Sequence, residues 1–351
     1  MSAPSMSGPI GFGVVAVGGM GAVHARNLAH RVPGAHLVAV TDIDAGRAKR
    51  VADELGAVAC ASYADVLARP DVDAVVVATP TALHGEQTIA AVHAGKHVLC
   101  EKPMTADLAE ADRVVAAVEE SGVVVRVGFQ RRHDADWCHG AALVRDGRVG
   151  APRLYFASFR ERELFDGDAL RDLLIHGNIH DLDAARWLLG EIDEISVVGQ
   201  AINGGSVAEG APAENLITSL RFASGALGVI DNGTNARFGF ECRAEVIGSE
   251  ATLRIGDSQG PAVTELRAGA MTQKLPADAA ERFDTAYVAL LADLCAAIRG
   301  EPEAGSMGAT AAEGRAALVL ALAAERSLIE GRPVRLEHGG EPAAVAYQMA
   351  N

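Results

Sequence analysis

Residues 12–21 read FGVVAVGGMG, an apolar run that ends in a glycine-rich turn. The apolar part predicts a buried strand, and the residues after it predict a helix. Ala16, Gly18 and Gly21 occupy the spacing A-x-G-x-x-G, with alanine in place of the usual first glycine. Asp42 stands at the end of the next apolar run. A strand, glycine turn, helix and later acidic residue in this order predict a dinucleotide-binding Rossmann fold.

The glycine turn predicts how a dinucleotide would bind. Gly18 lets the backbone approach the pyrophosphate, and Gly21 permits close packing of the helix against the strand. The helix N-terminus around Gly19 and Met20 offers free N–H groups and the positive end of a dipole. The alternative is that these glycines only form a tight turn in another α/β fold, without binding a dinucleotide. The strand before the motif and the helix after it disfavour this interpretation.

Asp42 predicts which dinucleotide is preferred. Its carboxylate would accept hydrogen bonds from the adenosine ribose and would repel a 2′-phosphate, which favours NAD over NADP. Ile43 and Arg47 join the predicted cofactor site, and Arg47 is near enough in sequence to soften that preference. Asp44 competes for the same role, although its place just before a helical pattern predicts an N-cap.

The strand and helix patterns divide the chain near residue 130. Strands and helices alternate up to Phe129, which predicts parallel βαβ units. Several strands then follow one another with glycine-containing turns between residues 191 and 266, which predicts a mostly antiparallel sheet. The expected organisation is α/β, with a flexible tail at 1–10, an NAD-binding domain at 11–129, and a substrate-binding and oligomerisation domain at 130–351.

Composition excludes several classes of partner. The chain has 351 residues and a formal charge of −15, and no basic block occurs. Nucleic acid and anionic membranes are therefore not expected as partners. The five cysteines are widely spaced without a CxxC pair, which predicts reduced thiols in the cytoplasm. The first residues show neither the basic start nor the apolar core of a signal peptide.

Four further motifs carry a family resemblance. TPTALH at 79–84 follows one predicted strand, and EKP at 101–103 follows the next. VGFQRR spans 127–132, and HDLDAARWL at 180–188 begins a helix of the second domain. In this order they strongly resemble the Gfo/Idh/MocA oxidoreductases over nearly the whole chain. The stretches FQRR and HDLDAARWL look most like the inositol dehydrogenase branch.

The resemblance implies an activity and its partners. Family members oxidise or reduce a secondary alcohol or ketone on a polyol, sugar or cyclitol with a nicotinamide cofactor, here expected to be NAD. The second domain carries a large open sheet that commonly mediates oligomer contacts, so a homodimer or homotetramer is expected. The resemblance also places a further set of residues on the cofactor side, namely Thr79, Pro80, His84, Glu101, Lys102 and Gln130.

Hydride transfer from an alcohol leaves a proton, so the reaction needs a base near the hydroxyl. Lys102 follows a parallel strand at the edge where α/β proteins bind ligands, and it matches the lysine that is essential in the family. It can hydrogen-bond the substrate and stabilise a developing alkoxide. His180 matches the family's catalytic histidine, the usual proton acceptor. The plain alternatives are a surface lysine in a proline turn and a packing histidine.

His176 is the main departure from the family pattern, which places aspartate four residues before the catalytic histidine. We include His176 in the catalytic and substrate-binding set, although a pocket wall without a role is an alternative. Asp172 would share a helical face with it, but Asn178 predicts a helix cap that leaves His176 in a loop. A metal site at His176 and His180 lacks a third ligand.

Two more residues complete the expected substrate side. Arg131, with its neighbour Arg132, matches basic residues of the family's substrate site, although either is equally able to pair with local acids. Glu161 stands where inositol dehydrogenases tend to carry asparagine. With His176, this departure leaves inositols, aminocyclitols, ketocyclitols and sugars open as substrates.

Two other functions remain open at this point. Some relatives are glycosidases that use tightly bound NAD for transient oxidation, and such an enzyme would release no net NADH. Others are catalytically silent sugar-sensing regulators, which would be expected to lose the lysine or the histidine. This chain retains Lys102 and His180, which favours an enzyme.

Overall fold

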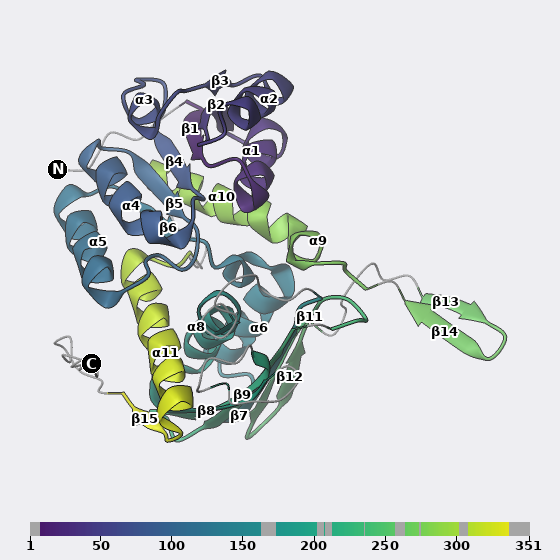
Figure 1. Ribbon diagram of the computed structural model, residues 1–351. Helices are drawn as coiled ribbons and strands as arrows, with labels where there is room; N and C mark the ends of the chain where they lie inside the picture. The colour runs from purple at the N-terminus through teal and green to yellow at the C-terminus, as the bar shows by residue number, and fades with distance from the viewer. Residues whose placement is uncertain are drawn as a thin grey trace. The chain divides into compact units, whose positions relative to one another are not determined.

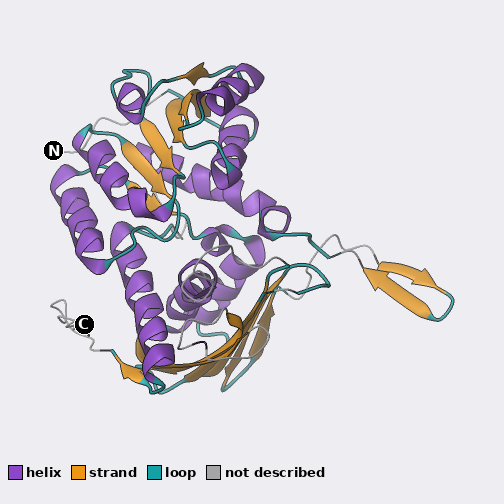
Figure 2. Cartoon of the chain, in the orientation of Figure 1, coloured by secondary structure: helices purple, strands orange, loops and turns teal. Residues whose placement is uncertain are grey.

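The computed structural model describes the following residues: 8–162, 173–201, 207, 213–234, 236–256, 264–273, 275–301 and 308–336. Contacts divide the chain into two compact units. The first comprises Met1–His139 and Ser258–Val319, and the second comprises Gly140–Asp257 and Leu320–Asn351. Each unit combines helices with one large sheet, which confirms the predicted α/β class (Figure 2).

The first unit is built on a six-stranded parallel sheet. Its strands are β1 (Ile10–Val15), β2 (Ala35–Thr41), β3 (Val58–Ala59), β4 (Ala74–Val77), β5 (His97–Cys100) and β6 (Val125–Val127). Their order is β3-β2-β1-β4-β5-β6, with every neighbouring pair parallel. The order reverses between β1 and β4, and such switch points bind ligands at the carboxyl ends of the strands. This is the predicted Rossmann topology.

Helices connect these strands in turn (Figure 1). They are α1 (Gly19–His30), α2 (Ala45–Leu55), α3 (Tyr63–Leu67), α4 (His84–His93) and α5 (Leu108–Ser121). Strands β1 and β4 are buried along their whole length, as continuous apolar runs between helical layers should be. Asp44 caps α2, because its carboxylate accepts a hydrogen bond from Arg47 N at 3.0 Å. The cap prediction for Asp44 is confirmed.

One helix of the first unit comes from far along the chain. α10 (Asp284–Arg299) buries Leu290, Leu291 and Leu294 in the same core as Phe12 of β1. The contacts therefore assign residues 258–319 to the first unit. The sequence analysis assigned every residue after 129 to the second domain. Helical periodicity shows which face of a helix is apolar, but it does not show which sheet that face covers.

Residues 258–319 also contain three shorter elements in their described part. A two-stranded hairpin, β13 (Thr264–Arg267) with β14 (Ala270–Gln273), precedes α9 (Ala279–Arg282).

The five cysteines are free thiols. Within the described part of the chain, no helix has both the length and the apolar character that crossing a membrane requires.

The second unit holds a seven-stranded sheet. Its strands are β7 (Pro152–Arg160), β8 (Ile192–Ala201), β9 (Ala213–Phe222), β10 (Leu227–Gly233), β11 (Glu241–Gly248), β12 (Thr252–Ile255) and β15 (Val334–Arg335). The order is β12-β11-β7-β10-β9-β8-β15, and only the β7–β10 pair among these is parallel. The prediction of a mostly antiparallel sheet is confirmed.

Among the described residues, helices cover one face of this sheet and leave the other face open (Figure 1). α8 (Ile179–Leu189) contacts β7, and Ser327 in the C-terminal half of α11 (Ala311–Glu330) accepts a hydrogen bond from Val197 N at 3.0 Å. The second half of α6 (Ala135–Arg145) also belongs to this unit. The open face carries a set of exposed apolar side chains, namely Phe156, Val198, Ile217 and Leu227.

Candidate active site

The turn between β1 and α1 has an unusual backbone. Ala16 has a φ of 64°, in the left-handed region that favours glycine. α1 begins at Gly19, with Gly18 as its N-cap. A Cβ at Gly21 would lie 1.8 Å from the Ala16 carbonyl oxygen, so only glycine allows this close packing. The turn therefore forms with alanine at position 16, although the left-handed conformation of this residue costs about 1–2 kcal/mol.

The N-terminus of α1 leaves room for a phosphate group. Gly19 is exposed, Met20 is half-buried, and a Cβ at Gly19 would meet none of the described atoms within 4 Å. The first N–H groups of a helix lack intrahelical partners and carry the positive end of its dipole. These residues fit the pyrophosphate of NAD.

Asp42 follows β2 and holds the glycine turn. Its Oδ2 accepts a hydrogen bond from Val17 N, and its Oδ1 accepts one from Asp44 N, both at 2.9 Å. Arg47 Nη1 lies 3.8 Å from Oδ2, and the Asp42 side chain is only 3% exposed. Each carboxylate oxygen retains a further acceptor position, which a ribose hydroxyl would reach beside Arg47. The adjacent Ile43 is fully exposed and offers an apolar contact.

Lys102 lies half-buried in the turn after β5, directly after the buried Glu101. Glu101 is 6% exposed, and its Oε1 lies 2.7 Å from Nε2 of the buried His24 on α1. Its Oε2 accepts a hydrogen bond from Lys102 N at 3.3 Å. A Cβ at Gly128 would lie 2.9 Å from the same Oε2. Glu101 thus joins α1, the Lys102 turn and the end of β6.

The charge of Glu101 is stabilised in place. Burial would raise the pKa of its carboxyl, but the hydrogen bond and charge of His24, with Lys102 and His84, lower the pKa below its usual value. Glu101 is therefore ionised at neutral pH and bonded to the protein itself. A role on the cofactor side would be indirect, through the turns that it holds.

His84 is the first residue of α4 and is 2% exposed. Its Nδ1 lies 2.7 Å from the carbonyl oxygen of Pro103, and its Nε2 lies 2.7 Å from that of Thr79. The Thr79 hydroxyl donates to Gln87 Oε1 at 2.8 Å, while Pro80 is exposed. The imidazole therefore contacts backbone on both sides, between the turns that follow β4 and β5.

The turn at 130–133 is more deeply buried than expected. Gln130 is 5% exposed, and both arginines that follow it are 2% exposed. The Arg131 guanidinium lies over the Trp137 ring, 5.4 Å from its centroid. Arg132 donates to Glu313 Oε1 at 2.6 Å, which is the pairing with a local acid that the sequence left open. Arg131 is therefore held against the Trp137 ring, and its contact with substrate stays a prediction.

His176 lies in a helical segment, whereas the sequence placed it in a loop. Leu173–Asn178 form a π-helical turn that runs directly into α8. Asn178 has helical angles and makes no side-chain cap, and its Nδ2 instead donates to Thr218 Oγ1 of β9 at 2.9 Å. The predicted cap is wrong because this side chain bonds the sheet. His176 is half-buried, and Asp172 lies outside the described residues.

His180 lies in the first turn of α8, beside a buried hydrogen bond that the sequence analysis did not assign. His180 is 7% exposed, and Asp181 is fully buried. Asn232 of β10, also fully buried, donates to Asp181 Oδ2 at 2.8 Å. This bond and the one from Asn178 fix both sides of His180 to the sheet. The available signal was an aspartate in a helix that packs on a sheet, where a buried carboxylate requires a partner.

Glu161 follows β7 at the end of the same sheet. Its backbone N donates to Gly233 O, and its backbone O accepts from Ala236 N, each at 2.9 Å. The residue is half-buried, and its Oε1 accepts a hydrogen bond from Arg162 N at 3.2 Å. The side chain therefore stays near the strand end, where it can meet a ligand.

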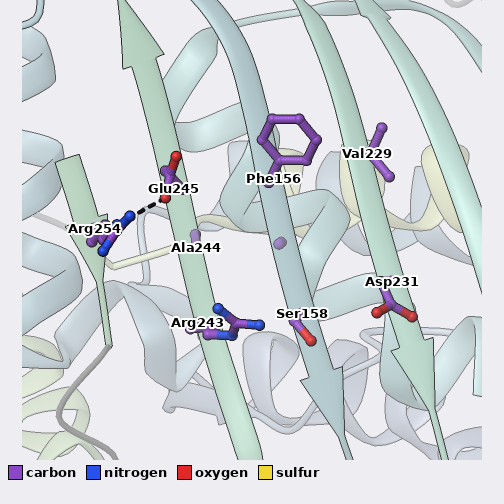
Figure 3. Close-up of a pocket in the computed structure, with 9 residues that line it drawn as sticks. Phe156, Ser158, Val229, Asp231, Arg243, Ala244, Glu245 and Arg254 are labelled. Atoms are coloured by element: carbon purple, nitrogen blue, oxygen red, sulfur yellow. Dashed lines mark hydrogen bonds and ion pairs between the residues drawn. The ribbon is translucent and has the colours of Figure 1, made fainter. Parts of the chain in front are cut away.

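A separate depression lies on the open face of the seven-stranded sheet. It has a volume of about 240 Å³ and is lined by Phe156, Val229, Asp231, Arg243 and Arg254, among others (Figure 3). α8 covers the opposite face, so this depression is distinct from the surroundings of His180. Among the described residues, no cluster of His, Cys, Asp and Glu is arranged to hold a metal ion.

Comparison with known proteins identifies the family of the chain. Residues 10–129 match the oxidoreductase family with an NAD-binding Rossmann fold, and residues 140–254 match the GFO/IDH/MocA C-terminal domain. An inositol 2-dehydrogenase of Rubrobacter xylanophilus is 37% identical over 333 residues, covering 93% of each chain. A scyllo-inositol 2-dehydrogenase (NAD(+)) of Bacillus subtilis is 34% identical over 331 residues, covering 92% of this chain and 95% of the relative.

A solved structure has a similar fold over nearly the whole chain. The myo-inositol dehydrogenase of Lactobacillus casei, in complex with NAD(H) and myo-inositol, aligns with a TM-score of 0.86 at 25% identity. The alignment covers 95% of this chain and 98% of that one. Because both domains match and the relatives align over nearly the full length, the protein belongs to the Gfo/Idh/MocA family of NAD-dependent oxidoreductases.

Proposed function

We propose that the protein is a reversible NAD-dependent dehydrogenase that oxidises a secondary alcohol of a cyclitol, or of a related sugar, to a ketone. The observation that supports this most is the alignment with an inositol 2-dehydrogenase over 93% of the chain. Lys102 and His180 stand at the matching motif positions in this sequence. A silent sensor would have no need to keep both groups.

The first unit would hold the cofactor. The N-terminus of α1 and the glycine turn would bind the pyrophosphate, Asp42 the adenosine ribose, and Ile43 would offer an apolar contact beside it. When bound, NAD supplies the hydride acceptor. A 2′-phosphate would meet the Asp42 carboxylate at this position, which supports selection of NAD over NADP.

Lys102 and His180 would handle the proton and the developing charge. The Lys102 ammonium would donate a hydrogen bond to the reacting hydroxyl oxygen and stabilise it as it becomes an alkoxide. His180 Nδ1 or Nε2 would take the hydroxyl proton and return it in the reverse reaction. The two anchors from Asn178 and Asp181 would hold the backbone on either side of His180.

His176 and Glu161 would select the substrate. A neutral imidazole donates or accepts a hydrogen bond but supplies no fixed negative charge. A ring that carries a keto group, or a different pattern of hydroxyl and amino groups, would then suit the site better than myo-inositol. Arg131 would contribute to the same substrate side, with its guanidinium held over the Trp137 ring.

NADH formation across a panel of inositols, aminocyclitols and sugars at alkaline pH tests the proposal. At least one cyclitol or sugar should give steady NADH release that Lys102→Ala lowers on the order of 10²-fold or more. Lys49→Ala provides a matched control, because Lys49 is exposed and pairs only with Asp53 in the described contacts. Glycoside cleavage without NADH, or ligand binding without turnover, would contradict the proposal.

We also propose that the protein forms a homo-oligomer through the open face of its second sheet. Val198 is 65% exposed, and Phe156, Ile217 and Leu227 are 40–43% exposed on that face. Such a set on one sheet face is typical of an interface. Light scattering after gel filtration should give a dimer or tetramer that Val198→Glu weakens, whereas a monomeric wild type would refute this assignment.

A further inference from the structure

Both ring nitrogens of His84 contact backbone carbonyl oxygens. Each ring nitrogen lies 2.7 Å from a backbone carbonyl oxygen, one of Pro103 and one of Thr79. Carbonyl oxygens only accept hydrogen bonds, whereas a neutral imidazole has one N–H and one lone pair. In the neutral ring, one lone pair would face a carbonyl oxygen at hydrogen-bond distance. Protonation of both nitrogens satisfies both contacts.

The surroundings of His84 support the added charge. Burial would lower the pKa of His84, but Cys100 and the carbonyl oxygens of Pro103 and Thr79 raise the pKa to about 9. The positive charge on His84 also stabilises the ionised Glu101, because it is one of the charges that lower the pKa of the Glu101 carboxyl. On the side of α5, the titratable group is Glu110, which packs against Gly85.

His84 connects three segments that meet at the cofactor edge of the sheet. It begins α4, it bonds the turn after β4 at Thr79, and it bonds the turn after β5 at Pro103. β4 and β5 are adjacent parallel strands. Pro103 directly follows Lys102, so the bond to its carbonyl oxygen fixes the backbone that carries the lysine.

We propose that His84 is a positioning residue for Lys102, acting as a doubly protonated imidazole that ties the Lys102–Pro103 turn to the Thr79 turn. Loss of one donor frees one of the two turns, and the lysine then samples other positions. The catalytic consequence rests on the proposed function of Lys102, but the tie itself does not. A displacement of about 1 Å in such a group lowers turnover on the order of 10²-fold.

Nitrogen-15 spectra of histidine-labelled wild-type protein test the protonation state without any substitution in the measured sample. His84→Gln identifies the signals of His84 among the 11 histidines. Both ring nitrogens of His84 should carry protons at pH 7. A single protonated nitrogen at that pH would overturn the proposal.

Lysine acetylation tests the tie to Lys102. The chain has only four lysines, at positions 49, 96, 102 and 274, so mass spectrometry can follow each one. In His84→Gln, the acetylation rate at Lys102 should change by about threefold or more while that at Lys49 stays constant. His93→Gln is the matched control, since His93 is exposed at the other end of α4 and should leave both rates unchanged.

Turnover separates this inference from the proposed function. Where the wild type oxidises a panel substrate, kcat of His84→Gln should fall about 10- to 100-fold, with thermal melting showing a folded protein. Wild-type kcat and an unchanged Lys102 acetylation rate in that variant would overturn the inference and leave the dehydrogenase proposal standing. A protein that oxidises no substrate would refute the dehydrogenase proposal, and the acetylation result would still decide the tie.

Discussion

Replacing Asp42 separates its two tasks, holding the glycine turn and selecting the cofactor. Asp42→Ala removes the acceptor of Val17 N and leaves that buried donor without its 2.9 Å partner. An unsatisfied buried donor costs about 1–3 kcal/mol, so the free energy of unfolding should fall by that amount. Asp42→Asn retains an acceptor oxygen for the buried Val17 N but loses the exposed bond from Asp44 N, so its stability should fall by less than that of Asp42→Ala.

Both variants should change the preference between NAD and NADP. The wild type should bind NAD more tightly by well over tenfold, which corresponds to about 1.4 kcal/mol or more. Without the carboxylate, the repulsion of a 2′-phosphate disappears, and Arg47, 3.8 Å from Asp42 Oδ2, loses that partner and becomes available to the phosphate. The ratio of the two dissociation constants should therefore approach one in Asp42→Asn as well as in Asp42→Ala.

Calorimetric titration of each variant with NAD and NADP measures that ratio, and urea denaturation measures stability. Asp53→Asn is a suitable control, since Asp53 lies on the neighbouring α2, 64% exposed, and should affect neither quantity. If Asp42→Asn kept a preference for NAD of more than about tenfold, the carboxylate would not be the selecting group and the argument from charge would be wrong.

The other predictions concern chemistry, specificity, stability and pH. Lys102→Ala and His180→Ala should each lower kcat on the order of 10²-fold or more with nearly unchanged NAD affinity by calorimetry, and normal turnover in both would refute their roles. His176→Asp should shift the ratio of kcat/KM values toward myo-inositol, by about 1–3 kcal/mol at most, and an unchanged ratio would place His176 outside the substrate site. Asn232→Leu should lower the free energy of unfolding by about 1.5–3 kcal/mol, because a hydrogen bond to a buried carboxylate is lost; equal urea midpoints would contradict this. Because the pKa of His84 is raised from 6.5 to about 9, its stabilising contribution should be complete below pH 6.5 and decline as pH rises through 9, and urea denaturation should show a smaller decline in His84→Gln than in the wild type.

Local patterns predict the Rossmann unit well. The apolar runs, the Asp44 cap and the glycine spacing each depend on residues close together in sequence, and β1, α1 and α2 form where these patterns predict a strand and two helices. Ala16 was the weak point of the motif. Its φ of 64° shows that the close approach of Gly21 to the Ala16 carbonyl fixes the turn more strongly than the residue at 16 does.

Long-range partners explain most of what the sequence did not predict. Asn178 has a side chain that commonly caps helices, but here it bonds Thr218 on β9, a residue 40 positions away in the sequence. α10 reads as an ordinary apolar helix, and its sequence does not indicate that it packs with β1. Arg131 and His84 likewise gain their partners, Trp137 and two backbone carbonyls, from the tertiary structure.

Transfer of deuterium from substrate to cofactor tests the central claim most directly. The best cyclitol or sugar from the panel, deuterated at its ring carbons, would be incubated with the wild-type enzyme and NAD, and the reduced cofactor would be analysed by mass spectrometry. The account predicts one deuterium in each NADH formed, together with a ketone product and slower turnover than with the undeuterated ring. Conversion of the substrate without release of deuterated NADH would contradict it.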